Sequence, residues 1–541
     1  MYTRAVLLLI LFILGAFEYA ALTGKIKRDI KALSCKEIMI SSALSLVLML
    51  LFAGMTGILG SEYHFVDDHE LLDIKNSFLV RGFWGTLGKF IRNDLTIRFR
   101  PTYYLIRVIQ TWLFRDNFFA WHVMYAVIAA FCFELPYAYA RSGGCPMWLS
   151  YVFSMMIYVG GGQSPALWRL GPQEAFGMIL LLLVILLLRS YFQQGGALRL
   201  VGFLLAMILL AGVKESFLIF LPFLPVILIK WEIERREAVS LTDLTTAVKR
   251  YAVPTTAVFA IFIIAIYIIL FRVGTNEIGY AGIDSSYAIM DYLIGICRIV
   301  IGSLRPYVFA WAAGNLLIIA ILWVNWQNIA PVVRFSAITD TIVCDTLMCM
   351  QMILYAKSGM IERYLLPATF LVGVLWFITI YRLYMTEQLK KDIPVYSALS
   401  IAIAVIMIFN VNDVKRIPYV YTGRNDQQMA LNYARDGAAT TEMLNKVGEL
   451  AGKEDIIVAD VIYEADISAA VYLKDRFGLD KVCAYGEYGS AEEIPVDMKN
   501  VKFFIGYPDV LETRIAEYGM RREDFTEYRY FIYALWVRNR E

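Results

Sequence analysis

Charge is scarce in this sequence, and neither sign forms a long block. Charged residues make up 18% of the 541 residues, and 50 Lys and Arg are balanced by 48 Asp and Glu. Soluble domains carry about 25% charged residues. A basic block of the kind that contacts nucleic acids is absent, which excludes a nucleic-acid partner.

Metal-binding and nucleotide-binding motifs are also missing. The chain has 3 His and 7 scattered Cys, with no CxxC pair and no Cys/His spacing typical of a zinc site. Residues 412–541 contain no GxGxxG or GxxxxGK loop and no Ser nucleophile elbow. We therefore predict no metal, no cofactor and no disulfide framework.

Apolar residues dominate instead, at 59% of the chain. A membrane-spanning helix needs about 20 mostly apolar residues. The long apolar runs predict a polytopic α-helical membrane protein with about twelve transmembrane helices. We expect these helices near residues 4–22, 38–59, 118–140, 146–162, 172–192, 198–213, 215–230, 251–271, 307–326, 336–356, 361–381 and 394–411.

One of these assignments has an alternative. The run at 4–22 also fits a signal peptide. It is long enough to span, however, and a basic segment follows it in place of a small-residue cleavage site. We therefore interpret residues 1–37 as an extra N-terminal helix with a basic cytoplasmic loop. The stretch 289–306 is expected to lie along the interface.

Basic residues in short loops predict the orientation, because Lys and Arg accumulate on the cytoplasmic side. They cluster at 25–36, 230–250 and 382–391, and each cluster lies an odd number of crossings from the N-terminus. We expect the N-terminus, the loop 61–117 and everything after 412 on the extracytoplasmic face. The protein is then a multi-pass protein of the plasma membrane.

The stretch SEYHFVDDHE, at 61–70, directly follows the second predicted span. Its last four residues are Asp67, Asp68, His69 and Glu70. So dense a polar group just outside a span of an apolar chain is a candidate reaction centre. The alternative is a solvated loop or a helix cap. Its histidines are expected to be hydrogen-bonding partners rather than metal ligands.

The rest of the loop 61–117 predicts two helices in the membrane interface. In the first, Leu71, Ile74, Phe78 and Leu79 are expected to share one apolar face, which Phe83, Trp84 and Leu87 continue. The second contains FRPTYYLIRVIQ and is expected to begin at Pro101. The alternative is a pair of soluble connecting helices.

Composition changes to charged and mixed at residue 412, and strands alternate with helices from there. Strands are predicted in EDIIVADV, KVCAYG, NVKFFIGY and EYRYFIYALWVRN, with helices before 452 and in YEADISAAVYLKDRFG. We therefore expect residues 412–541 to form a small extracytoplasmic α/β domain with a structural or acceptor-facing role.

Further charged residues fall near the membrane boundary on the same predicted side as Asp67 and Asp68. They are Arg169 and Glu174 in LWRLGPQE, Lys214 and Glu215 in VKES, Arg305 in LRPY, and Glu362 and Arg363 in ERYLLP. Such charges are costly and usually functional. Ordinary explanations are a helix N-terminal carboxylate, a polar turn and snorkelling arginines. Their shared side predicts a single site.

This arrangement resembles the polytopic glycosyltransferases of the C superfamily (GT-C), which use lipid-linked sugar donors. The likeness covers about residues 38–411, with the external loop at 61–117. It consists of the acidic pair at the start of that loop, FRPTYYL within it, and LGPQE and ERYLLP at the outer ends of later spans. The preceding extra helix and the following His69 and Glu70 depart from the pattern.

The resemblance implies inverting transfer of a sugar, a hexosyl or pentosyl group, from a polyprenyl-phosphate donor to an acceptor hydroxyl. The acceptor is a glycan, a glycolipid or a protein. In that chemistry an aspartate is the general base; Asp67 and Asp68 both match, because the doublet leaves the register open. Glu174 is the second acidic residue.

The resemblance also assigns the binding residues. Cations hold the departing lipid phosphate, and we expect Arg363 and Lys214 in that role, with Arg305 third. His69, Glu70, Arg100 and Tyr103 complete the expected substrate site. The family divides on metal use, so a divalent ion stays open, although the sequence contains no firm ligand pattern.

Three other functions compete with this interpretation. A polysaccharide polymerase or ligase would use a diphosphate-linked glycan. A secondary transporter would place charges near the midplane and show related halves, whereas the charges here gather at one boundary and no repeat is found. A scaffold with the C-terminal domain as a binding module is the third.

Overall fold

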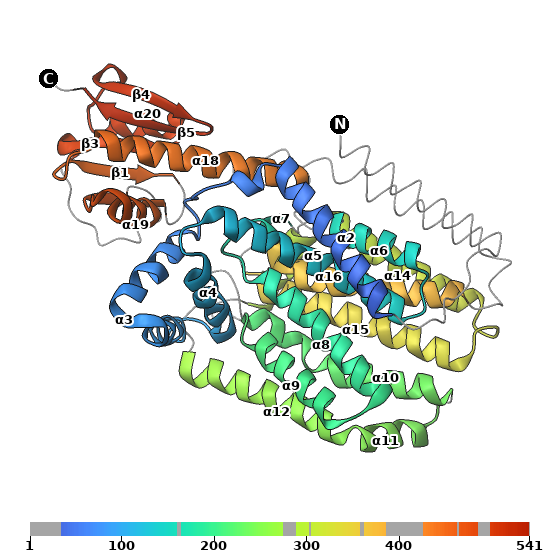
Figure 1. The fold of residues 1–541 in the computed structure, drawn as a ribbon. Coiled ribbons are helices and arrows are strands. Elements are labelled where there is room, and N and C mark those ends of the chain that lie inside the picture. Colours follow the sequence, from blue (N-terminus) through green and yellow to red (C-terminus); the bar gives the residue numbers. More distant parts are fainter. Residues whose placement is uncertain are drawn as a thin grey trace.

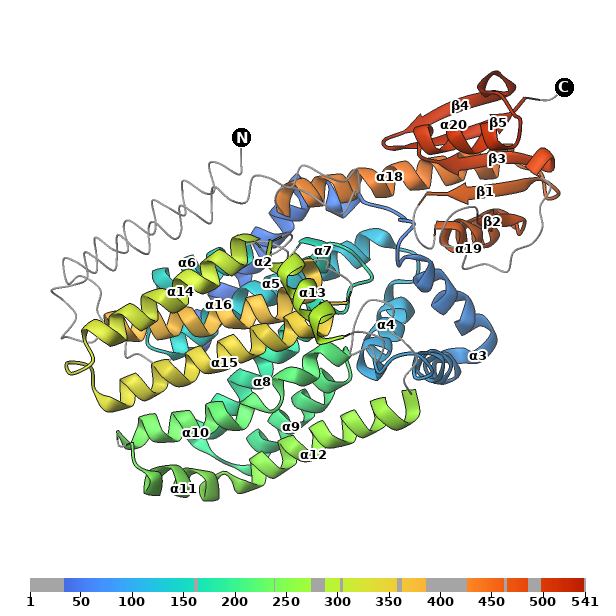
Figure 2. The ribbon, with the colours of Figure 1, turned by 180° about the vertical axis from the view of Figure 1, so that it is seen from behind.

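The computed structural model describes residues 34–159, 164–237, 239–273, 288–301, 305–357, 362–385, 426–461, 465–484 and 498–539. Most of the chain before residue 385 is helical and forms one bundle (Figure 1). A smaller domain with a sheet follows and lies at one end of this bundle. The view from behind shows the same arrangement, with α11 at the far end (Figure 2).

The helices of the bundle have the following bounds. They are α2 (Cys35–Met55), η1 (Ile58–Gly60), α3 (His69–Asp94), α4 (Pro101–Phe114), α5 (Phe118–Ser142), α6 (Met147–Val159), α7 (Ser164–Leu167), α8 (Glu174–Gln194) and α9 (Ala197–Ala211). They continue with η2 (Glu215–Phe220), α10 (Phe223–Arg236), α11 (Leu241–Arg250), α12 (Ala252–Ile268), η3 (Ile269–Val273), α13 (Ile289–Ile301), α14 (Arg305–Val324), α15 (Pro331–Tyr355) and α16 (Glu362–Tyr384).

Six helical segments of the described part are long and apolar enough to cross a membrane. They are Cys35–Met55, Phe118–Ser142, Glu174–Gln194, Glu215–Arg236, Ala252–Val273 and Pro331–Tyr355. The chain is therefore a multi-pass membrane protein. Ten of the twelve predicted ranges coincide with helical segments, and the other two, 4–22 and 394–411, lie outside the described residues. A total of twelve spans stays a prediction.

One coinciding helix, α9, is too short to cross a membrane by itself. Helix α9 has 15 residues, against the 20 or so that the hydrocarbon core requires. Apolar side chains are exposed on α2, α12 and η3, including Leu51, Met55, Ile263 and Phe271. Exposed apolar side chains of this kind are expected where helices face lipid.

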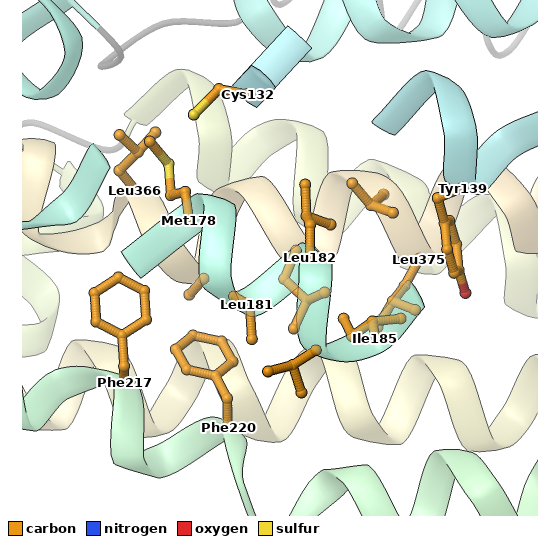
Figure 3. Close-up of a cluster of buried hydrophobic side chains, with 14 of the residues drawn as sticks. Cys132, Tyr139, Met178, Leu181, Leu182, Ile185, Phe217, Phe220, Leu366 and Leu375 are labelled. Atoms are coloured by element: carbon orange, nitrogen blue, oxygen red, sulfur yellow. The ribbon is translucent and has the colours of Figure 1, made fainter. Parts of the chain in front are cut away.

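Helix α8 lies in the middle of the apolar core. Figure 3 shows its inward face, which meets side chains from η2, α5 and α16. The labelled residues of this cluster are Cys132, Tyr139, Met178, Leu181, Leu182, Ile185, Phe217, Phe220, Leu366 and Leu375. Close packing on several sides holds α8 in place, and with it the carboxylate of Glu174 at its first turn.

The loop 61–117 forms two helices, α3 and α4, as predicted, and α4 begins at Pro101. The prediction of one continuous apolar face along α3 is wrong. Gly82 has φ 63 and breaks the helix into two parts. Leu71 is buried before the break, whereas Leu79 and Trp84 are 85% and 78% exposed around it. Glycine tolerates positive φ without a steric penalty, so the helix direction changes there.

The C-terminal domain contains a five-stranded mixed sheet in the order β2-β1-β3-β5-β4. Its elements are α18 (Asp426–Leu450), β1 (Ile456–Asp460), α19 (Ala465–Phe477), β2 (Val482–Ala484), η5 (Met498–Asn500), β3 (Val501–Gly506), α20 (Pro508–Glu517), η6 (Arg522–Asp524), β4 (Phe525–Tyr530) and β5 (Tyr533–Arg538). Strands β2, β1 and β3 are parallel, and β5 is antiparallel to both β3 and β4.

Two details of this domain differ from the prediction. The stretch EYRYFIYALWVRN is a hairpin rather than one strand, because Phe531 has φ 53 at the turn between β4 and β5. Helix α20 was not expected. The α/β composition of the domain is confirmed within the described residues.

Lys230 is not part of the basic loop in which it was placed. Helix α10 continues to Arg236, and Lys230 is buried within it beside Asp340 of α15, with Nζ and Oδ1 2.5 Å apart. Thr379 of α16 donates to the other oxygen of Asp340. A buried charge needs a partner, and this pair supplies it where three helices meet.

Candidate active site

Asp67 lies at the end of the segment that connects η1 to α3. Its backbone has φ 73, a conformation that a non-glycine residue adopts only when its surroundings hold it there. Its Oδ2 accepts a hydrogen bond from Nη2 of Arg169 at 2.7 Å, and 31% of the side chain is exposed. The carboxylate is thus anchored and still accessible.

Gly171 makes this position possible. A Cβ at Gly171 would lie 2.2 Å from Cβ of Asp67, well inside van der Waals contact. The glycine in LWRLGPQE therefore allows two segments that are about a hundred residues apart to meet at the ion pair between Asp67 and Arg169.

The pKa of Asp67 is lowered. Burial raises it, but the charges of Arg169 and Arg363 outweigh burial and bring it below its ordinary value. An aspartate in apolar surroundings would show the opposite shift. Asp67 is consequently ionised at neutral pH and is a weaker base than burial alone would make it.

Asp68 has a different environment from its neighbour. It is completely buried, and its Oδ2 accepts from the backbone N–H of His64 at 3.0 Å. The same oxygen lies 3.1 Å from Nδ1 of His64. Nε2 of His64 in turn donates to the carbonyl oxygen of Tyr433 in α18. Asp68 is therefore bonded into the protein interior, whereas Asp67 faces the cluster of charged residues.

A second ion pair joins Glu174 and Lys214. Their Oε1 and Nζ atoms are 2.5 Å apart and both side chains are buried. Lys214 also lies over the ring of Tyr364, 4.1 Å from its centroid, a cation–π contact. Burial lowers the pKa of Lys214 to about 8, although Glu174 opposes this shift.

The turn that carries Lys214 is held by the loop 61–117. The N–H of Thr102 donates to the carbonyl of Gly212 at 2.8 Å. Oε1 of Glu215 accepts from the backbone N–H of Phe99 at 2.7 Å, and its Oε2 from Arg98 at 3.3 Å. The start of α4 and the Lys214 turn thus have a fixed relation.

Arg363 is placed between the two ion pairs at the first turn of α16. Its charge acts on both Asp67 and Glu174. Nη2 donates to Tyr364 Oη at 3.2 Å, whereas Nε and Nη1 are buried with no hydrogen-bond partner among the described residues. Buried unsatisfied guanidinium nitrogens are costly, and an anionic ligand would satisfy them.

Glu70 is held by the aromatic pair of FRPTYYL. Its two oxygens accept from the hydroxyls of Tyr103 and Tyr104, each at 2.7 Å. Burial raises the pKa of both tyrosines, so they remain protonated and donate. Arg107, one turn further along α4, is completely buried with Nε 3.6 Å from Glu70. Its guanidinium lies over Trp121.

The other predicted site residues have separate positions. Arg100 forms an ion pair with Asp94 through Nε and Nη2, which neutralises it. His69 begins α3, and its buried Nδ1 has no hydrogen-bond partner within the described part. Arg305 begins α14, and its side chain lies outside the described residues. Among the residues that the structure describes, no three His, Cys, Asp or Glu side chains gather as metal ligands.

Two residues of this cluster had no role assigned from sequence. Arg169 was noted in LWRLGPQE, but its position in that motif does not indicate that it pairs with Asp67, about a hundred residues away. Arg107 follows Tyr103 by four positions, so both lie on one face of a helix. That spacing is a usable signal, because it places a cation beside the tyrosines that bind Glu70.

Fold and cluster together describe a polytopic membrane protein with a charged site at one end of its bundle, beside a small α/β domain. Two similar solved structures are ArnT from Cupriavidus metallidurans bound to undecaprenyl phosphate and the same protein in the apo state. Each has a TM-score of 0.43 and 12% sequence identity, and the alignments cover 92% and 91% of this chain and 97% of the other. No family model and no curated protein matches the chain.

Proposed function

We propose that the protein is a membrane glycosyltransferase. It moves a sugar from a polyprenyl-phosphate donor to an acceptor hydroxyl at the extracytoplasmic face, with inversion at the anomeric carbon. The observation that carries the proposal is the grouping of two carboxylates, Asp67 and Glu174, with Arg169, Lys214 and Arg363. This set supplies a base and a phosphate site within one cluster.

Asp67 is the proposed general base, because it is ionised, anchored and accessible. The acceptor oxygen bonds to the anomeric carbon as the bond from that carbon to the phosphate oxygen breaks. The acceptor proton passes to Asp67. The low basicity imposed by Arg169 favours late proton transfer, when the forming bond has made the hydroxyl more acidic. Glu174 stays in its pair with Lys214 and keeps that cation in place.

Arg363 is the proposed partner of the leaving phosphate. Its Nε and Nη1 have no hydrogen-bond partner in the described part of the chain, and a guanidinium suits bidentate contact with phosphate. The charge of Lys214 is neutralised by Glu174. Lys214 therefore contributes a hydrogen-bond donor to the phosphate site and little net positive charge. One uncompensated guanidinium suits a monophosphate, which leaves with less charge than a diphosphate.

The second candidate is a polymerase or ligase that uses a diphosphate-linked glycan. Arg107 favours it, because all three of its guanidinium nitrogens are buried without a hydrogen bond in the described residues. A second phosphate would give these nitrogens hydrogen-bond acceptors, which the ion-pair contact with Glu70 at 3.6 Å does not. The two candidates differ in donor, so parallel assays with monophosphate-linked and diphosphate-linked sugars separate them.

The test of the proposal is Asp67→Asn, assayed for sugar transfer in proteoliposomes containing a polyprenyl-phosphate sugar. We expect turnover to fall by about 10²-fold or more, the usual cost of losing a general base. Asp73→Asn is the matched control, since it makes the same change at an exposed carboxylate of the next helix. Full turnover by Asp67→Asn would exclude this residue as the base.

A further inference from the structure

We infer that helix α18 of the C-terminal domain positions Asp67, so that His64, Gly437 and Thr441 are positioning residues of the active site. The inference rests on the proposed function for its effect on turnover. It extends that function by making the soluble domain a working part of the site. Asp67 approaches the cluster from a loop whose conformation the C-terminal domain holds.

The residues before Asp67 are buried against this domain. The ring of His64 stacks on that of Tyr433, with centroids 3.6 Å apart. The backbone N–H of Tyr63 donates to Oγ1 of Thr441 at 3.1 Å. Phe65 packs edge-on against Tyr533. Each contact joins the loop to the C-terminal domain, and two of them are to α18.

Gly437 of α18 lies where this contact is tightest. A Cβ there would be 2.6 Å from Oγ of Ser61 and 2.7–2.8 Å from ring atoms of His64. Only a glycine lets the helix approach so closely without displacing the loop. The packing is therefore sensitive to a single methyl group.

A short path of bonds leads from α18 to Asp67. Nε2 of His64 donates to the Tyr433 carbonyl at 2.9 Å. The backbone N–H and Nδ1 of His64 both contact Oδ2 of Asp68, whose peptide bond continues into Asp67. The left-handed backbone of Asp67 needs such support on both sides.

The partner of Asp67 is supported by the same helix. Helix α18 packs against α7, the short helix that directly precedes Trp168 and Arg169. Figures 1 and 2 show α18 crossing this end of the bundle close to α7 and to the start of the external loop. Both segments that meet in the ion pair of Asp67 and Arg169 are thus in contact with α18.

The experiment compares two pairs of variants in the full chain, reconstituted in nanodiscs. Thr441→Val removes the acceptor for Tyr63, and its control is Thr440→Val, since Thr440 is also buried but its hydroxyl has no partner in the described residues. Gly437→Ala adds the clashing methyl. Its control is Gly452→Ala, where a Cβ would meet its nearest neighbour at 3.5 Å.

Two quantities are measured: hydrogen–deuterium exchange of the peptide 61–70, and kcat and KM for the donor. We expect Thr441→Val and Gly437→Ala to raise exchange in 61–70 and to lower kcat by about ten- to hundredfold with KM within about twofold, because misplacement by an ångström has such effects. The controls should match wild type in both.

The inference is overturned if exchange in 61–70 does not rise, or if it rises while kcat stays at the wild-type value. Should Gly437→Ala not fold, Thr441→Val decides, because it adds no volume. If the wild-type protein transfers no sugar, the proposed function fails. Hydrogen–deuterium exchange does not depend on sugar transfer. Unchanged exchange of the peptide 61–70 in the variants would then still refute the inference that α18 holds this loop in place.

Discussion

Asp67 and Asp68 are chemically identical neighbours, yet they differ in exposure and in bonding partners. Asp67 has a partly exposed carboxylate that contacts Arg169. Asp68 is fully buried and bonded to His64. At the scale of single residues, hydrogen bonding and ion pairing therefore decide which aspartate would be open to an acceptor in the proposed reaction.

Removing Arg169 should make kcat/KM fall at low pH, where Asp67 becomes protonated. In wild type the lowered pKa keeps Asp67 ionised through pH 5–8, so Asp67 contributes no acid limb to kcat/KM there. In Arg169→Gln the largest charge that opposes burial is lost, so the pKa of Asp67 rises relative to the wild type. We expect the acid limb of Arg169→Gln to lie at a higher pH than that of the wild type, measured as kcat/KM from pH 4.5 to 8.

The linkage for stability has a definite sign. Since the folded pKa of Asp67 lies below its unfolded value, the pair stabilises the fold above about pH 4 and loses this effect as the pH falls through the folded pKa. Arg81→Gln, at an exposed arginine of α3, is the control. If kcat/KM depends on pH in the same way in the wild type and in Arg169→Gln, Asp67 is not the group that Arg169 keeps ionised for catalysis.

Lys214 should produce an alkaline limb. Its pKa is lowered to about 8, so deprotonation above that pH leaves Glu174 without its ion-pair partner and weakens the proposed phosphate site. Arginine stays charged, and we expect Lys214→Arg to move the limb of kcat upward by at least about one pH unit. The measurement is kcat between pH 6 and 10.

Unfolding does not explain such a limb. The unfolded lysine has a pKa of about 10.4, so between pH 8 and 10.4 the unfolded state binds more protons and this group makes the fold more stable as pH rises. A falling thermal midpoint over that range, or an alkaline limb at the same pH in Lys214→Arg, would argue against Lys214 as its source.

At the scale of elements, helix ends and tight turns bring the site together. Helix α8 begins at Glu174, α16 at Glu362, and the α9–η2 turn presents Lys214. The packed core around α8 sets their distances (Figure 3). Gly171 then lets the loop with Arg169 lie against Asp67.

Gly171→Ala should displace Asp67 without altering any charged group. A Cβ there would overlap the side chain of Asp67, and we expect overpacking of about 1–3 kcal/mol together with a loss of turnover of about tenfold or more. Gly60→Ala is the control, because a Cβ there has no atom within 4 Å. Turnover and thermal midpoint are measured for both. Wild-type turnover in Gly171→Ala would show that the contact does not position the base.

At the scale of the whole molecule, orientation is the prediction that remains to be measured. Basic loops place residues 61–117 and the C-terminal domain outside and α11 inside. The structure agrees in one respect: the C-terminal domain and α11 lie at opposite ends of the bundle (Figures 1 and 2).

Cysteine labelling of intact cells tests this orientation. In a variant without native cysteines, we expect a membrane-impermeant thiol reagent to label Glu62→Cys and Arg521→Cys, at exposed positions of the loop and the C-terminal domain. Thr242→Cys, exposed on α11, should react only after the cells are permeabilised. Labelling of Thr242→Cys in intact cells, or protection of the other two, would reverse the model.

Much of the architecture was predictable because it depends on local patterns. Hydropathy over some 20 residues marks a span, Pro101 marks the start of α4, and alternating patterns mark the strands of the C-terminal domain. The turn at Phe531 and the break at Gly82 were missed, because a single residue with positive φ barely alters the pattern around it.

The sequence by itself determined that the chain is a multi-pass membrane protein with a polar first loop and a C-terminal α/β domain, and it named the charged residues near one boundary. Only the tertiary structure decided which of them meet. Asp67 contacts Arg169, about a hundred residues away in the sequence. Lys214 pairs with Glu174 over a separation of 40 residues, and His64 bonds to Tyr433 over 369. Hydropathy is a property of short segments, whereas an ion pair depends on the packing of distant ones.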